Sequence, residues 1–168
     1  RYTEDKDTLW KRLKDGTIDC IATDHAPHTL EAKSAGFPNA PSGMPGVETA
    51  LPVMLTHASA GKCSVSDVVG WMCAGPAKVY GMENKGSLIE GYDGDLTLVD
   101  LETKRVITDA DTWTRVGWTP YAGREMTGWP IHTIVDGRVV HSRERGGSLR
   151  GTAVATPGSA GRALKFSD

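Results

Sequence analysis

The sequence predicts an α/β fold followed by a small β-rich part. Three observations predict it. A helix, a tight turn and a short apolar run follow one another over residues 3–23, further helical segments lie between residues 47 and 81, and short β runs dominate after Gly86. We expect the boundary near residues 81–86, which divides the chain into 1–82 and 83–168.

The first expected element is a helix with Thr3 as its N-cap. Glu4 and Asp5 place negative charge in the first turn, where the helix dipole favours it. Gly16 ends this helix. Residues 18–23 then form a short, mostly apolar run, which is typical of a strand buried on both faces of a parallel sheet.

A long loop and three helices follow. Residues 24–46 contain four prolines and three glycines, and a loop of this length in a compact domain is usually functional or disordered. The pattern then predicts helices over 47–60, over 65–73 with Ser64 as the cap, and from Pro76 to Gly81.

The β-rich part is expected to contain strands at 95–100, 133–135 and 139–140. Asp136-Gly137 between the last two runs is a strong hairpin signal. The Gly- and Ala-rich stretch 146–161 is expected to be a mobile tail, and residues 163–166 to anchor it.

The charge balance excludes some partners. The 168 residues carry 19 Lys and Arg against 21 Asp and Glu, a net charge of −2, which argues against nucleic acid or an anionic membrane surface. The longest apolar runs are far shorter than the roughly 20 residues of a membrane span. Three cysteines form no CxxC motif, and two of them, Cys20 and Cys73, lie in apolar surroundings; this indicates buried free thiols in a reducing compartment, and hence the cytoplasm.

Two groups of residues in the β-rich part are expected to have structural roles and not to bind a ligand. Tryptophans at 113, 118 and 129 lie close in sequence to arginines, and we expect them to pack where the β part meets the rest of the fold rather than to stack bases. Arg143, Arg145 and Arg150 are expected to form a solvated basic face.

The segment with the clearest chemical signal is Asp24-His25-Ala26-Pro27-His28. Asp24 follows the predicted strand directly, and in α/β barrels the carboxyl ends of strands face the active site. A carboxylate beside a metal-activated water can accept a proton during hydrolysis, and His28 could donate to a substrate. On spacing alone, Asp24 could equally cap a turn while both histidines are solvated.

Longer runs resemble one family. Residues 21–28 together with 42–49 closely resemble the last barrel strand and following loop of dihydroorotases, which are zinc-dependent cyclic amidohydrolases. The resemblance continues through 75–81, 86–96, 119–123 and 128–130. It implies the C-terminal part of an amidohydrolase (β/α)8 barrel, with the last strand and its helices, plus most of a small β-sandwich domain.

The resemblance also implies roles for particular residues. Asp24 would contact the metal and transfer a proton to the leaving ring nitrogen. His28 would help to hold the substrate carboxylate, and backbone groups of Ser42 and Gly43 would line the substrate pocket. His25 would have a supporting role or be solvated.

Other parts of the family's metal site have no counterpart in these residues. The family uses an early His-x-His, a carboxylated lysine and two further histidines for two zinc ions, whereas His57, His132 and His141 lack ligand spacing. The chain also lacks an initiator Met, so we expect a piece of a longer protein. On its own it should be inactive and bind no zinc tightly.

The implied function is dihydroorotase activity, the reversible hydrolysis of dihydroorotate to N-carbamoyl-L-aspartate in pyrimidine biosynthesis. Two alternatives remain. One is a cyclic amidase of the allantoinase or hydantoinase type, and the other is a non-catalytic, dihydroorotase-like partner of aspartate transcarbamoylase. The expected partners are a small-molecule substrate and a second copy of the chain in a homodimer.

Overall fold

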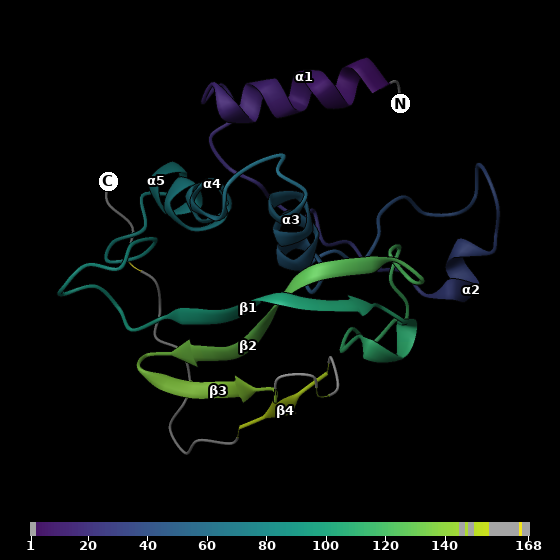
Figure 1. Cartoon of the computed structure of the whole chain (residues 1–168). Coiled ribbons are helices and arrows are strands. Elements are labelled where there is room, and N and C mark those ends of the chain that lie inside the picture. Colours follow the sequence, from purple (N-terminus) through teal and green to yellow (C-terminus); the bar gives the residue numbers. More distant parts are fainter. Residues whose placement is uncertain (1–2, 145–146, 148–149, 155–164, 166–168) are drawn as a thin grey trace. The chain divides into compact units, whose positions relative to one another are not determined.

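A computed structural model describes residues 3–144, 147, 150–154 and 165 (Figure 1). The chain divides into two compact units, each assembled from distant segments of sequence. The first unit combines residues 1–22 with 64–93 and 161–168, and the second combines residues 23–63 with 94–160. Within this described part, no helix has the length and apolar character needed to cross a membrane.

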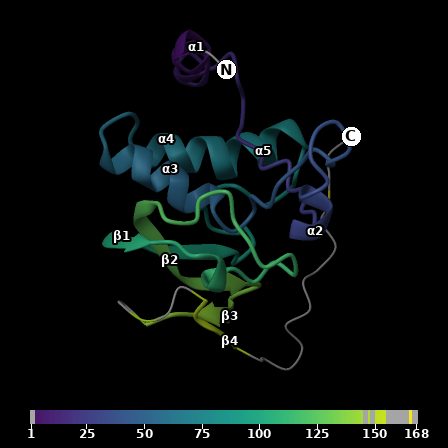
Figure 2. The same cartoon turned by 90° about the vertical axis from the view of Figure 1, so that its right-hand side faces the viewer.

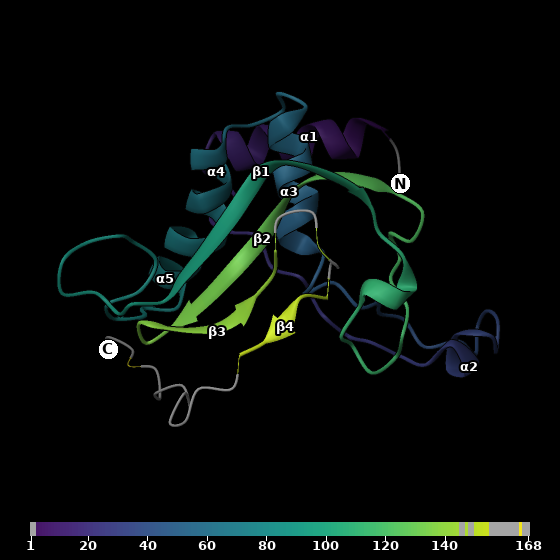
Figure 3. The ribbon, with the colours of Figure 1, turned by 60° about the horizontal axis from the view of Figure 1, so that its bottom comes forward.

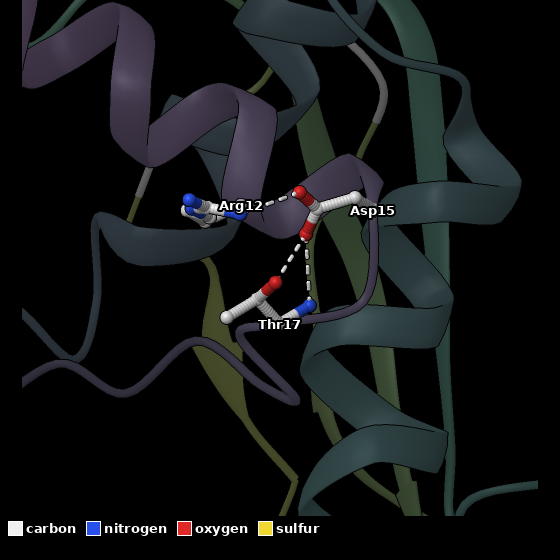
Figure 4. Close-up of polar contacts among 3 residues, drawn as sticks. All are labelled: Arg12, Asp15 and Thr17. Carbon is white, nitrogen blue, oxygen red and sulfur yellow. Dashed lines mark hydrogen bonds and ion pairs between the residues drawn. The ribbon is translucent and has the colours of Figure 1, made fainter.

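The first unit begins with α1 (Thr3–Lys14), which matches the predicted helix. The turn after α1 is fixed by Asp15, as Figure 4 shows. One carboxylate oxygen of Asp15 accepts hydrogen bonds from the hydroxyl of Thr17 at 2.6 Å and its backbone N–H at 3.0 Å, and the other accepts from Arg12. These donors lower the pKa of Asp15. Gly16 in this turn has φ +76°, a conformation that favours glycine.

Residues 18–23 do not form the predicted strand. They form no β-ladder, and in this run Ile21 donates its N–H to the carbonyl oxygen of Trp71 at 2.9 Å. A parallel strand needs neighbouring strands for its hydrogen bonds, and the described residues provide none beside this run. The prediction of a regular strand from these residues is therefore wrong for the chain as it stands.

The two helices predicted over 65–81 are one continuous helical path of α4 (Val65–Val69), a π-helical turn, η1 (Gly70–Ala74), and α5 (Gly75–Val79), as Figure 2 shows. The predicted Ser64 cap is confirmed. Its hydroxyl accepts from the N–H of Asp67, and the Asp67 carboxylate accepts from the N–H of Ser64, which completes a capping box. Cys73 in this path is exposed, so its predicted burial is wrong.

The second unit contains a four-stranded antiparallel sheet in the order β1-β2-β3-β4 (Figure 3). Its strands are β1 (Leu96–Val106), β2 (Glu125–Val135), β3 (Arg138–Ser142) and β4 (Thr152–Ala153). The predicted hairpin is confirmed, with Asp136 at φ +50° and Gly137 at φ +74°. Of the predicted mobile tail, residues 146, 148–149 and 155–161 lie outside the described residues, as does most of the predicted anchor at 163–166.

Helix α3 (Ala50–Ser59) covers one face of this sheet (Figures 1 and 3). It packs closely on β2 at Gly128, where a Cβ atom would lie 2.6 Å from the Cβ of Leu55. A hydrogen bond of 3.0 Å from the N–H of Thr127 to the hydroxyl of Thr56 joins the same two elements. The loop before α3 contains one further short helix, α2 (Leu30–Lys33), and a 3-10 turn, η2 (Asp109–Asp111), follows β1.

Candidate active site

Asp24 begins the long loop in an unusual backbone conformation. Its φ is +46°, and non-glycine residues adopt this left-handed region infrequently, aspartate and asparagine more readily than others. The side chain is exposed. Because unusual backbone conformations cluster at functional sites, the conformation adds a structural reason to single out this carboxylate.

The structure brings the two halves of the predicted motif together. The N–H of Ala26 donates to the carbonyl oxygen of Met44 at 3.2 Å, and His25 and Met44 form an isolated parallel bridge. Gly43 lies so close that a Cβ atom there would be 2.6 Å from the carbonyl oxygen of Ala26. With φ +104°, Gly43 is also in a conformation that side chains disfavour.

His25 has a supporting role in this arrangement. Its Nδ1 accepts the backbone N–H groups of Gly46 at 3.1 Å and Val47 at 3.3 Å. A backbone N–H donates, so the imidazole takes part in both bonds as an acceptor. His25 is exposed and also supports the loop, which agrees with the supporting or solvated role expected for it.

Lys33 holds the far side of the same loop, a role that the sequence did not indicate. Its ammonium group donates to the carbonyl oxygens of Pro41 and Gly43, each at 2.8 Å. The α2 helix that carries Lys33 is capped by Thr29, whose hydroxyl accepts from the N–H of Ala32. A local cap therefore positions a lysine that fixes the backbone around the predicted substrate-binding residues.

A second segment, residues 112–119, is fastened to this loop. The two carboxylate oxygens of Glu48 accept the N–H groups of Trp113 at 2.7 Å and Thr114 at 2.8 Å. The indole of Trp118 donates to the carbonyl oxygen of His28 at 2.8 Å. Neither anchor was predicted, because each joins residues more than sixty positions apart.

The predicted substrate-binding side chains differ in exposure. Ser42 is exposed and His28 is half-buried. The residual cavity where the two loops meet is about 10 Å3 and is lined by residues that include His25, Glu48 and Trp118. This volume suits one water molecule at most, so the junction is a packed support beside the candidate site rather than a substrate pocket.

A metal centre is not complete within the described residues, because no three His, Cys, Asp or Glu side chains come together there in a way that could hold an ion. The histidines of the sheet have other contacts. His132 Nδ1 lies 2.9 Å from the Ser142 hydroxyl, and His141 Nε2 lies 2.9 Å from the carbonyl oxygen of Arg150. Asp24 is thus the single metal ligand that the sequence predicted, and among the described residues it does not belong to a group of three or more possible ligands.

Comparison with known proteins places these features in context. The sequence profile of the amidohydrolase family matches residues 2–140. A dihydroorotase from Halalkalibacterium halodurans is 43% identical over 141 residues, which cover 83% of this chain and 33% of that protein. A dihydroorotase from Pyrococcus furiosus is 38% identical over 169 residues, which cover 100% of this chain and 39% of that protein.

Solved structures of hydantoinases are similar to the chain in fold. An L-hydantoinase (dihydropyrimidinase) from Arthrobacter aurescens superposes with a TM-score of 0.82 at 33% identity, covering 92% of this chain and 34% of that one. A D-hydantoinase superposes with a TM-score of 0.80 at 28% identity and covers 34% of that chain. The chain therefore spans about a third of the length of the relatives that it matches.

Proposed function

Because the chain belongs to the amidohydrolase family, we propose that it is part of a dihydroorotase, which reversibly hydrolyses the cyclic amide of dihydroorotate to N-carbamoyl-L-aspartate in pyrimidine biosynthesis. The observation that carries the proposal is the pairing of residues 24–28 with 42–46, the two runs on which the resemblance depends. Curated relatives with 38–45% identity bear the name dihydroorotase. Cytoplasmic location and a homodimer belong to the same proposal.

The chain would be the C-terminal part of a (β/α)8 barrel with most of a small β-sandwich. In this proposal residues 1–82 belong to the barrel and 83–168 to the sandwich domain. Residues 18–23 would become the last barrel strand once neighbouring strands supply hydrogen-bond partners. Within the described residues this run pairs with no strand, which leaves that pairing open to the remainder of the protein.

Each candidate residue has a chemical task in this proposal. The exposed carboxylate of Asp24 would accept a proton from the attacking water and return it to the ring nitrogen as the amide opens. His28 would donate to the substrate carboxylate. Ser42 and Gly43 would offer backbone groups to the substrate, held in place by Lys33 and by the contact of Gly43 with Ala26.

Members of the amidohydrolase family are generally metal-dependent, and zinc is the ion we propose for the whole protein. The residues of this chain do not fit a complete zinc site. Zinc takes about four ligands, and Asp24 has no companion ligands among the described residues. Asp24 would contribute one carboxylate to a site whose other ligands come from the remainder of the protein, and the isolated chain would be inactive.

A second candidate function is hydrolysis of a different cyclic amide, because the hydantoinases are structural neighbours. Steady-state assays of the full-length protein on dihydroorotate, hydantoin and allantoin separate the two. We expect kcat/KM for dihydroorotate to exceed kcat/KM for hydantoin and for allantoin by about 100-fold or more. A site whose polar groups bind the carboxylate of its substrate rejects rings that lack this carboxylate. Preference for hydantoin or allantoin would overturn the assignment.

A non-catalytic partner of aspartate transcarbamoylase is the remaining alternative. A degenerate partner has no need for the catalytic carboxylate, and this chain retains both Asp24 and His28. Purification together with a transcarbamoylase, with no turnover of any of the three substrates, would favour the partner role over the enzyme.

A further inference from the structure

Arg143 follows β3 and is a buried cation without a complete set of partners. The residue is 6% exposed, in contrast to the solvated face predicted for it. Its Nε has no hydrogen-bond partner among the described residues. The guanidinium lies over the ring of Trp129, with Cζ 5.7 Å from the centroid, so one face of the cation is covered by an aromatic wall.

Charges of both signs act on Arg143. Burial lowers the pKa of the guanidinium, nearby Arg105 lowers it further, and Asp100 acts in the opposite direction. The carboxylate of Asp100 accepts hydrogen bonds from the N–H of Glu102 and from the N–H and hydroxyl of Thr103. A buried charge with an unpaired donor is costly, and an arginine remains protonated, so the arrangement favours an added anion.

Arg143 borders a cavity of about 230 Å3 within the second unit. A second cation borders the same cavity: Arg150, whose guanidinium Cζ lies 4.8 Å from the centroid of Trp113. The carbonyl oxygen of Arg150 lies 2.9 Å from His141 Nε2, and this contact ties the residue to β3. The cavity therefore has a buried cation, an exposed cation and aromatic walls.

Two carboxylates at the cavity have other partners. Both oxygens of Glu48 accept backbone N–H groups, from Trp113 and Thr114. One oxygen of Asp111 accepts from the N–H and hydroxyl of Thr108. These contacts direct both carboxylates toward residues 108–114.

We propose that this cavity binds a small oxyanion, a carboxylate or a phosphate, with Arg143 as its buried anchor and Arg150 as the second cation. The volume is below the 300 Å3 or so at which drug-sized ligands begin, so a small ion fits better than a nucleotide or peptide. Guanidinium groups suit both anions because their donors match two oxygens at once. The site is distinct from Asp24 and His28, and the proposal does not depend on the catalytic activity.

The test is isothermal titration calorimetry of the full-length protein at low ionic strength, once with inorganic phosphate and once with succinate. We expect saturable binding of at least one of them. Arg143→Met should weaken it about tenfold or more, and Arg150→Met should weaken it several-fold, since each removes a charge-assisted contact. The two titrations distinguish a phosphate ligand from a carboxylate ligand.

Arg124→Met is the matched control. Arg124 also stacks on an aromatic ring, 5.6 Å from the centroid of Tyr121, but it is exposed and does not border the cavity. Its substitution should leave binding unchanged within about twofold. Absence of saturable binding for both anions, or binding that survives Arg143→Met, would overturn the proposal. If Arg143→Met does not fold, undiminished binding by Arg150→Met overturns it equally.

Discussion

The backbone N–H of Ala26 donates a hydrogen bond to the carbonyl oxygen of Met44 over 3.2 Å. This bond joins the segment that carries Asp24 and His28 to the segment that carries Ser42 and Gly43. Residues that are distant in the sequence thereby form one rigid edge of the loop, supported by His25 on one side and Lys33 on the other. A proton-transfer group such as the Asp24 carboxylate must be held in a fixed position relative to the residues that bind the substrate.

Replacement of Gly43 by alanine should separate the two segments. The new Cβ would lie 2.6 Å from the Ala26 carbonyl oxygen and 2.8 Å from the Ala26 Cβ, and the backbone φ of +104° disfavours any side chain. We expect amide hydrogen exchange at Ala26 to accelerate about 30-fold or more, corresponding to a loss of roughly 2 kcal/mol.

Gly36→Ala is the control for this change. Gly36 lies in the same loop with φ +69°, but nothing lies within 4 Å of a Cβ there. The substitution should cost about 1 kcal/mol locally and leave exchange at Ala26 unchanged. Equal acceleration by both variants would show that backbone conformation, and not the contact with Ala26, explains the effect.

Lys33→Met should loosen the loop while keeping the aliphatic length of the side chain. It removes two hydrogen bonds of 2.8 Å from a charged donor to the carbonyl oxygens of Pro41 and Gly43. Hydrogen bonds to charged groups contribute about 1.5–3 kcal/mol each when partly buried. We expect faster proteolytic cleavage within residues 36–43, whereas Lys78→Met, at an exposed position on α5, should not change it.

The stability of the protein should depend on His57 in mildly acidic solution. Burial lowers the pKa of His57 below its ordinary value of 6.5, and Lys62 lowers it further. As the pH falls through 6.5, the unfolded chain therefore binds a proton that the folded chain resists, and the free energy of unfolding decreases. His57→Gln should flatten this decrease between about pH 7 and 5.5 in denaturant titrations. An unchanged slope would exclude His57 as its source.

Local signals explain what the sequence predicted correctly. The Ser64–Asp67 capping box and the Asp136-Gly137 hairpin each depend on a few neighbouring residues, so their patterns are sufficient. The run 18–23 has the composition of a buried strand, but a parallel strand forms only when distant strands pair with it.

The supporting residues of the candidate site were not predictable in the same way. Lys33 and Glu48 are single polar residues in a loop, without periodicity or spacing that separates them from solvated neighbours. Arg143 belongs to a run of arginines that suggests a solvated face, yet tertiary packing buries it over Trp129. Among several similar charged residues, the tertiary fold alone determines which one is buried or bonded to a distant segment.

The central claim is that the Asp24 carboxylate transfers a proton during cyclic amide hydrolysis. The most direct measurement is the steady-state rate of dihydroorotate turnover by full-length Asp24→Asn, which retains the shape of the side chain but cannot accept the proton. We expect kcat to fall by about 100-fold or more, with Glu31→Gln, an exposed carboxylate variant in the same loop, close to the unmodified protein. An Asp24→Asn enzyme that turns over within a few-fold of the unmodified rate would contradict the account.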